Sequence, residues 1–177
     1  MLHLIIDGYN LIRQVPSLES KDKQSLEAGR KALIDALKRY QKTKPYRITI
    51  VFDGASTLSD FAPAFKEGGI RICFSPASRS ADDVIKDMAK DAKSHGIVVS
   101  SDNSVIKEAK YSGCAVIASK DFWDKLKFAN LAVQDKMTNK DEGKSVPKHK
   151  RWATYKKGPS KKLPKKQRQN KSKLDKL

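Results

Sequence analysis

The chain has 177 residues, a mass of 19.8 kDa and a formal net charge of +17 at pH 7. This length suits one ordinary domain with an appendage, and the excess of positive charge predicts a polyanionic partner. No apolar stretch approaches the roughly 20 residues that cross a bilayer. A strand that begins at the second or third residue leaves no room for a secretory leader. We therefore expect a cytoplasmic protein with no membrane partner.

Positive charge is concentrated in the last part of the chain. Residues 136–177 hold 16 Lys and Arg against 3 Asp and Glu, whereas residues 1–135 hold 21 against 17. The last part also lacks an apolar repeat and contains three prolines, so it cannot bury enough surface to offset the entropy of ordering. We expect a folded domain over residues 1–135 and a basic, largely disordered tail over residues 136–177.

Five short apolar runs predict strands. In chain order they cover residues 4–6, 47–52, 70–74, 97–100 and 115–118. Apolar residues at helical spacing predict helices over residues 22–42, over 81–95, in a short stretch ending at Gly113, and from about Ser119 onward. The second and third strands are joined by a loop. This alternation predicts a three-layer α/β domain around a parallel sheet.

Aspartates occur where the predicted strands end. Asp7, Asp53 and Asp102 follow the first, second and fourth strands, while Asp82 and Asp83 open the helix after the third strand. In a parallel sheet these positions lie together at the carboxyl ends of the strands, so five carboxylates should meet in one crevice. Like charges at close range raise one another's pKa and need a cation to balance them. Because the set includes no His or Cys, the predicted ion is Mg²⁺ or Mn²⁺ rather than zinc.

An acidic crevice on a protein with a basic arm is typical of phosphodiester cleavage. A metal ion in such a crevice can activate water and neutralise the charge that develops on the scissile phosphate. Taken singly, each aspartate also has a structural explanation as a helix cap, a partner of the helix dipole or a turn former. The prediction therefore depends on the convergence of all five.

Four short motifs resemble those of a known family. They are Asp7-Gly8-Tyr9-Asn10, Val51-Phe52-Asp53, Ala81-Asp82-Asp83-Val84-Ile85 and Ser100-Ser101-Asp102-Asn103. In this order they resemble NYN domains, a branch of the PIN-like nucleases, and are most similar to the bacterial YacP-like ribonucleases. The resemblance covers about residues 1–130 and leaves out the basic tail. It implies a five-stranded PIN-like sheet of order 3-2-1-4-5 and a Mg²⁺-dependent endoribonuclease.

The resemblance also implies a role for each site residue. Three carboxylates would bind the metal, those of Asp7, Asp82 and Asp102, and Asn10 would orient water or substrate beside it. Four further residues would support them: Asp53, Asp83, Ser101 and Asn103. Family members often carry Glu in place of Asp83 and a further acid near Asn103. These two departures weaken the case for a second metal ion.

The tail is expected to hold nucleic acid, with RNA as the partner and the ribosome as a further one. Its cations would contact phosphates, and Trp152 or Tyr155 would stack on exposed bases. The predicted contacts are Lys148, Lys150, Arg151, Trp152, Tyr155, Lys156, Lys157, Lys161, Lys162, Lys165, Lys166 and Arg168.

The two cysteines are predicted to stay unpaired. Cys73 and Cys114 belong to the third and fifth strand segments. In the implied strand order these segments lie on opposite edges of the sheet, too far apart for a disulfide. We expect two buried free thiols.

Three other functions stay open. A non-catalytic RNA-binding or ribosome-associated protein would carry a decayed form of the same site, although Asp7, Asn10, Asp82 and Asp102 are all present. A phosphatase or nucleotide-binding protein is disfavoured, because neither a Gly-rich phosphate loop nor an Asp-x-Asp pair follows the first strand. Charge alone does not separate DNA from RNA as the substrate.

Overall fold

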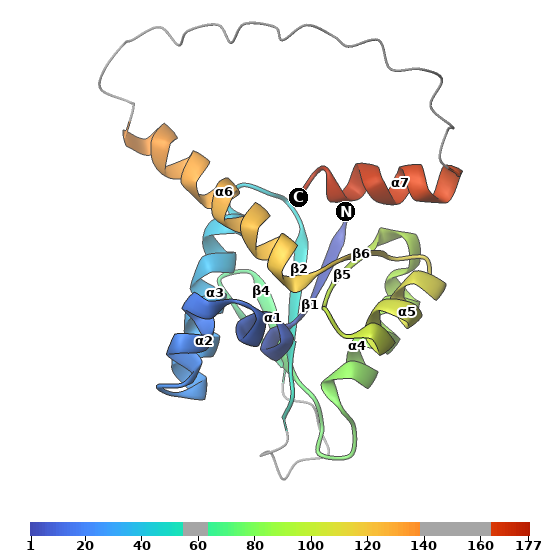
Figure 1. Cartoon of the computed structure of the whole chain (residues 1–177), viewed down its shortest axis with the longest axis horizontal. Coiled ribbons are helices and arrows are strands. Elements are labelled where there is room, and N and C mark those ends of the chain that lie inside the picture. The colour runs from blue at the N-terminus through green and yellow to red at the C-terminus, as the bar shows by residue number, and fades with distance from the viewer. Residues whose placement is uncertain (55–63, 139–163) are drawn as a thin grey trace, which may run out of the picture.

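The computed structural model describes residues 1–54, 64–138 and 164–177, with the backbone alone for residues 132–138 and Lys166. At its centre is a six-stranded sheet of order β3-β4-β2-β1-β5-β6 (Figure 1). The strands are β1 (His3–Asp7), β2 (Arg47–Phe52), β3 (Ala64–Glu67), β4 (Ile70–Phe74), β5 (Gly96–Val99) and β6 (Ala115–Ile117). The five parallel strands have the predicted order. The prediction missed β3, which pairs antiparallel with β4 at the edge of the sheet.

Helices cover both faces of this sheet. They are α1 (Gly8–Gln14), α2 (Pro16–Asp22), α3 (Leu26–Gln41), α4 (Ala81–Ala92), the 3-10 turn η1 (Lys93–His95), α5 (Asn103–Tyr111), α6 (Ser119–Thr138) and α7 (Lys165–Leu174). Figure 1 shows α1, α2, α3 and α6 on one face and α4 with α5 on the other, which confirms the three-layer α/β class. Within the described ranges, no helix is both long and apolar enough to cross a bilayer.

Each face of the sheet has its own hydrophobic core, which explains why the parallel strands are mostly apolar on both faces. Leu4 and Ile6 of β1 point into the core under α1, α3 and α6, whereas Ile5 points into the core under α4 and α5. Cys73 and Cys114 are buried in the second core as free thiols, and β2, β1 and β5 separate their ends of the sheet. The prediction of two unpaired cysteines is confirmed.

The start of the chain differs from the prediction in two places. Helix α1 begins at Gly8, directly after β1, where no helix was predicted. A Cβ atom at position 8 would collide with the ring of Phe52, so glycine is required here for close packing. The predicted helix over residues 22–42 is also two helices: α2 ends at Asp22, and Ser25 caps α3 by accepting a 3.0 Å hydrogen bond from the N–H of Ala28.

The end of the chain is more ordered than its composition predicts. Helix α7 lies across the amino end of the sheet (Figure 1), and Leu177 is only 6% exposed within the larger core. The hydroxyl of Tyr40 donates a 3.0 Å hydrogen bond to the carbonyl of Leu177, and that of Tyr46 donates a 2.8 Å bond to the carbonyl of Lys176. The expectation of a disordered tail is therefore wrong for residues 164–177.

Candidate active site

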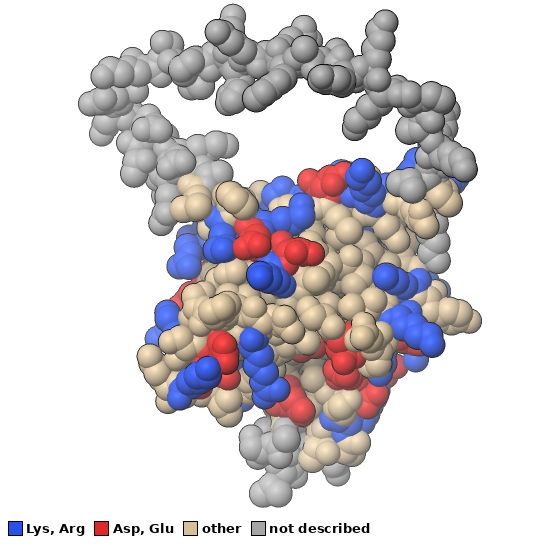
Figure 2. Space-filling view, viewed as in Figure 1, with Lys and Arg blue, Asp and Glu red and all other residues tan. Residues whose placement is uncertain are grey.

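A cavity of about 410 Å³ opens at the carboxyl ends of the parallel strands. Four aspartates contribute to its lining: Asp7, Asp53, Asp82 and Asp102. Each comes from a different strand-to-helix or strand-to-loop junction, as the parallel topology predicts. In Figure 2, which has the same view as Figure 1, Asp and Glu side chains (red) gather at the lower right, near α4.

Asp7 is the most buried of these acids, at 7% exposure. It caps α1, where its Oδ1 accepts a 3.1 Å hydrogen bond from the N–H of Asn10, and its Oδ2 accepts a 3.0 Å bond from Ser100 Oγ. Burial raises the pKa of Asp7 to about 6, with smaller contributions from the charges of Asp82 and Asp102, although both hydrogen bonds oppose the rise. Ionising this carboxyl group is therefore costly in the folded protein.

Asp102 behaves differently because it caps a helix from a more open position. Its Oδ1 accepts hydrogen bonds from the N–H groups of Ser104 (2.8 Å) and Val105 (3.1 Å) at the start of α5. Hydrogen bonds from Ser104 and Val105 hold the pKa of Asp102 below its ordinary value. The expectation that the acids raise one another's pKa is thus wrong for Asp102.

The remaining predicted acids divide between the cavity and its outside. Burial and the charge of Asp102 raise the pKa of Asp82, which lies in the first turn of α4. Asp53 accepts a 3.1 Å hydrogen bond from Ser75 Oγ. Asp83 does not line the cavity: its Oδ2 accepts a 2.8 Å bond from Ser80 Oγ, and its own N–H donates to the same hydroxyl. Asp83 instead pairs with Ser80, the N-cap residue of α4, in contrast to the predicted set of five.

Asn10 is held by a polar network behind the cavity wall. Its Oδ1 accepts hydrogen bonds from the N–H of Ser101 (2.9 Å) and from Ser119 Oγ (2.7 Å). A backbone N–H can only donate, so the bonded atom must be the amide oxygen, and the NH₂ group remains available as a donor. Asn10 can thus offer the cavity a hydrogen-bond donor. Ser101 supports it through its backbone, whereas Asn103 is exposed and lies outside the lining.

Sequence reasoning gave no role to two serines that position the site. Ser100 and Ser119 are fully buried and bind Asp7 and Asn10, respectively. Ser100 directly follows β5, and Ser119 follows β6 after a single alanine. The rule that located the aspartates, a polar residue at the carboxyl end of a parallel strand, therefore also locates these serines.

A wall of aromatic and cationic side chains flanks the acids. Arg13 lines the cavity, and its guanidinium carbon lies 5.6 Å from the ring centre of Tyr9. Arg30 packs over the same ring at 5.3 Å, and its Nε donates a 2.8 Å hydrogen bond to the Tyr9 hydroxyl. The Phe52 ring meets Tyr9 edge-on at 5.2 Å. Tyr9 is therefore fixed in place, and Arg13 brings positive charge to an otherwise acidic cavity.

The chemistry of the lining fits a hard divalent cation, because its candidate ligands are carboxylates without thiols or imidazoles. In the part of the chain that the structure describes, however, no three His, Cys, Asp or Glu side chains lie close enough together to hold one ion. The four aspartates thus surround the cavity without converging on a single point.

The three-layer fold and the acidic cavity at the strand ends define a domain of the PIN-like nuclease class. The sequence model of the YacP-like NYN domain matches residues 4–173, and the chain belongs to this family. The match extends beyond residue 130 and includes most of the basic segment, which corrects the narrower extent inferred from the motifs alone.

Known relatives agree with this assignment. The chain is 29% identical over 87 residues to the uncharacterized protein YacP of Bacillus subtilis (strain 168), a match that spans 49% of this chain and only about half, 51%, of that relative. The crystal structure of Rae1 (YacP) from Bacillus subtilis superposes with a TM-score of 0.66 at 20% identity, covering 78% of this chain and 80% of that one. A tryptophan-to-leucine mutant of the same protein gives 0.64 at 20% identity, covering 82% and 86%. At this identity the structures show a shared fold.

Proposed function

We propose that the protein is a ribonuclease that cuts RNA internally with the help of Mg²⁺ or Mn²⁺. The observation that carries this proposal is the group of four aspartates around one cavity, including a buried carboxylate whose pKa is raised to about 6. A buried acid that is costly to ionise and shares its cavity with three other aspartates is better explained by a bound cation than by stability.

Each residue of the cavity has a task in this proposal. Asp7, Asp82 and Asp102 would hold the ion, some of them through water, because Mg²⁺ usually keeps several waters and binds few carboxylates directly. When bound, the ion would supply an activated water and neutralise charge at the scissile phosphate. The NH₂ group of Asn10 and the guanidinium of Arg13 would donate hydrogen bonds to phosphate oxygens, as amides and arginines do at phosphoryl groups. Ser100 and Ser119 would keep Asp7 and Asn10 in position.

The test uses a circular RNA, which has no ends and is opened only by an endonuclease. We expect opening with Mg²⁺ or Mn²⁺ and none in EDTA. Asp82→Asn should lower the rate by about 100-fold or more, the scale for removing one group that stabilises the transition state. Asp83→Asn is the matched control, because this carboxylate belongs to the same helix turn but lies outside the cavity. Equal rates for the two variants, or opening that persists in EDTA, would contradict the proposal.

A second candidate function is RNA binding without cleavage. It is favoured by the observation that no three acids among the described residues converge closely enough to hold an ion. In that case circular RNA and a circular DNA of the same sequence would both bind to the protein, and both would stay intact with either metal. Cleavage of DNA at the rate of RNA would instead show that the sugar is not distinguished.

The predicted RNA contacts of the tail are part of this proposal. Nine of the twelve lie outside the described residues: Lys148, Lys150, Arg151, Trp152, Tyr155, Lys156, Lys157, Lys161 and Lys162. Lys165 and Arg168 are exposed on α7, and Lys166 belongs to the same helix. Association with the ribosome is proposed on the same ground, since its surface is rich in RNA phosphate.

A further inference from the structure

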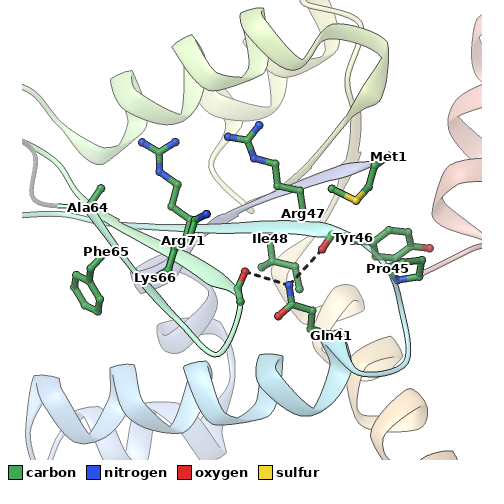
Figure 3. A pocket seen from close by; sticks show the side chains of 11 residues that line it. Met1, Gln41, Pro45, Tyr46, Arg47, Ile48, Ala64, Phe65, Lys66 and Arg71 are labelled. Atoms are coloured by element: carbon green, nitrogen blue, oxygen red, sulfur yellow. Dashed lines mark hydrogen bonds between the residues drawn. The ribbon is translucent and has the colours of Figure 1, made fainter.

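The end of the sheet opposite the acidic cavity is lined by cations. Two cavities of about 710 Å³ each open there. The charged side chains of the first are Arg47, Lys66 and Arg71 (Figure 3), and those of the second are Lys165, Arg168, Lys173 and Lys176. We call these seven residues the basic face. No Asp or Glu is among the described residues that line either cavity.

Strand register places the first group on one side of the sheet. Arg71 of β4 pairs with Thr49 of β2, and Arg47 lies two residues before Thr49, so both arginines project from the same face. Lys66 of β3 pairs with Arg71 and shares that face. Figure 3 shows Arg47 and Arg71 extending to the same side, away from Gln41.

The two cavities adjoin one another. The backbone N–H of Arg47 donates a 3.1 Å hydrogen bond to the carbonyl of Leu2, which lines the second cavity. The hydroxyl of Tyr46, in the first cavity, donates to the carbonyl of Lys176 in the second. The two cavities therefore lie next to one another, between the edge strands and α7.

The positive charge of this surface is not balanced within the described residues. None of the seven cations forms an ion pair there, whereas on other surfaces Lys38 pairs with Glu67 and Arg79 with Asp87. The same positive charge affects His3, which pairs with Arg47 in the sheet. Burial, together with the charges of Arg47 and Arg71, lowers the pKa of His3 to about 4. An external anion would relieve this repulsion.

We propose that the basic face binds the phosphodiester backbone of a nucleic acid, at a site separate from the acidic cavity. Seven cations along two adjoining hollows match a polymer with regularly repeated phosphates better than a single small anion. Strand β1, which has five residues, spans the distance between the two ends of the sheet, about 13 Å at the usual rise per residue. One phosphate cannot touch both ends. The basic face therefore adds affinity for long or folded nucleic acids and none for oligonucleotides that fill only the acidic cavity.

The experiment measures binding in EDTA, so its outcome does not depend on whether the protein is a nuclease. Two double variants divide the basic face, R47Q/R71Q on the strands and K165Q/R168Q on α7. The control is K31Q/K107Q, which removes two exposed lysines that lie outside both cavities and form no ion pair with described residues. Affinity for a 30-nucleotide single-stranded RNA and a DNA of the same sequence is measured against salt concentration, after thermal melting has shown that each variant is folded.

For each double variant of the basic face we expect the slope of log affinity against log salt to flatten by about 1.4, since each single-strand phosphate contact contributes about 0.7. The control should keep the wild-type slope. A flatter slope in the basic-face variants for RNA alone, or for RNA and DNA alike, supports the proposal and identifies which nucleic acid is bound. Unchanged slopes in both basic-face variants, or the same loss in the control, would overturn it. Loss of binding to vesicles of anionic lipid with nucleic-acid binding intact would also overturn it.

Discussion

The two ends of the central sheet carry opposite charge, and they are built by different means. At the carboxyl end, Asp7 and Asp102 cap α1 and α5 with their side chains. At the amino end, Arg47 and Arg71 project from strands without acidic partners among the described residues, and α7 covers the surface beside them. In a parallel α/β fold, helices begin at the carboxyl ends of strands and finish near their amino ends. The acids thus lie where helix dipoles are positive and the bases where they are negative.

The largest expected effect concerns the basic end, which depends on packing. Leu177→Ala should lower the free energy of unfolding by about 3 kcal/mol, because Leu177 is buried in the larger core. Leu131→Ala is the control, since Leu131 is 55% exposed and its loss should change stability by less than about 0.5 kcal/mol. Urea unfolding of both variants makes the comparison. Equal stability of the two would mean that α7 is not held by its apolar contacts.

An intermediate effect concerns the acidic end, where burial makes Asp7 costly to ionise. The folded protein holds the proton of Asp7 more tightly than the unfolded chain, with a pKa of about 6 against 3.8. The wild type should therefore lose stability as the pH rises through this range, and Asp7→Asn should not. In EDTA we expect the variant to match the wild type near pH 4 and to exceed it by about 1–2 kcal/mol at pH 7, after allowance for an altered bond to Ser100. A constant difference across pH would show that Asp7 is not strained.

The smallest effect separates the two kinds of aspartate within the cavity. Asp102→Ala should cost about 1 kcal/mol in EDTA at pH 7, because it removes the cap of α5. Asp102→Asn should cost almost nothing, since asparagine caps equally well. Thermal melting of both variants beside Asp7→Asn tests the distinction. A gain in stability in Asp102→Ala would place Asp102 with Asp7 as a strained acid.

Sequence alone located the acidic end well. The order of the parallel strands was predicted correctly, and the place of three of the four aspartates follows from one local rule, that a polar residue ends each apolar run; Asp82 instead opens a helix. The rule could not predict the pKa of each acid. Asp7 and Asp102 look alike in sequence, yet the first is desolvated and the second accepts two backbone hydrogen bonds. That difference depends on depth in the fold.

The basic end was largely missed, for physical reasons. Composition predicted disorder for residues 164–177. In the structure Leu174 and Leu177 pack against the larger core and hold α7 in place, together with hydrogen bonds from Tyr40 and Tyr46. Likewise Arg47 and Arg71 are 24 positions apart, and only strand register brings them to one face. Non-local contacts of this kind leave no periodic signal in the sequence.

The hydrogen bond from Tyr40 to Leu177 has a consequence for the order in which a new molecule is assembled. It joins residues 137 positions apart. During synthesis the chain emerges from its N-terminus, so every residue that holds the acidic cavity, up to Ser119, leaves the ribosome before α7 does. Tyr40 and the amino ends of the strands stay uncovered through that interval. We expect each nascent chain to complete its acidic end first and its basic end last.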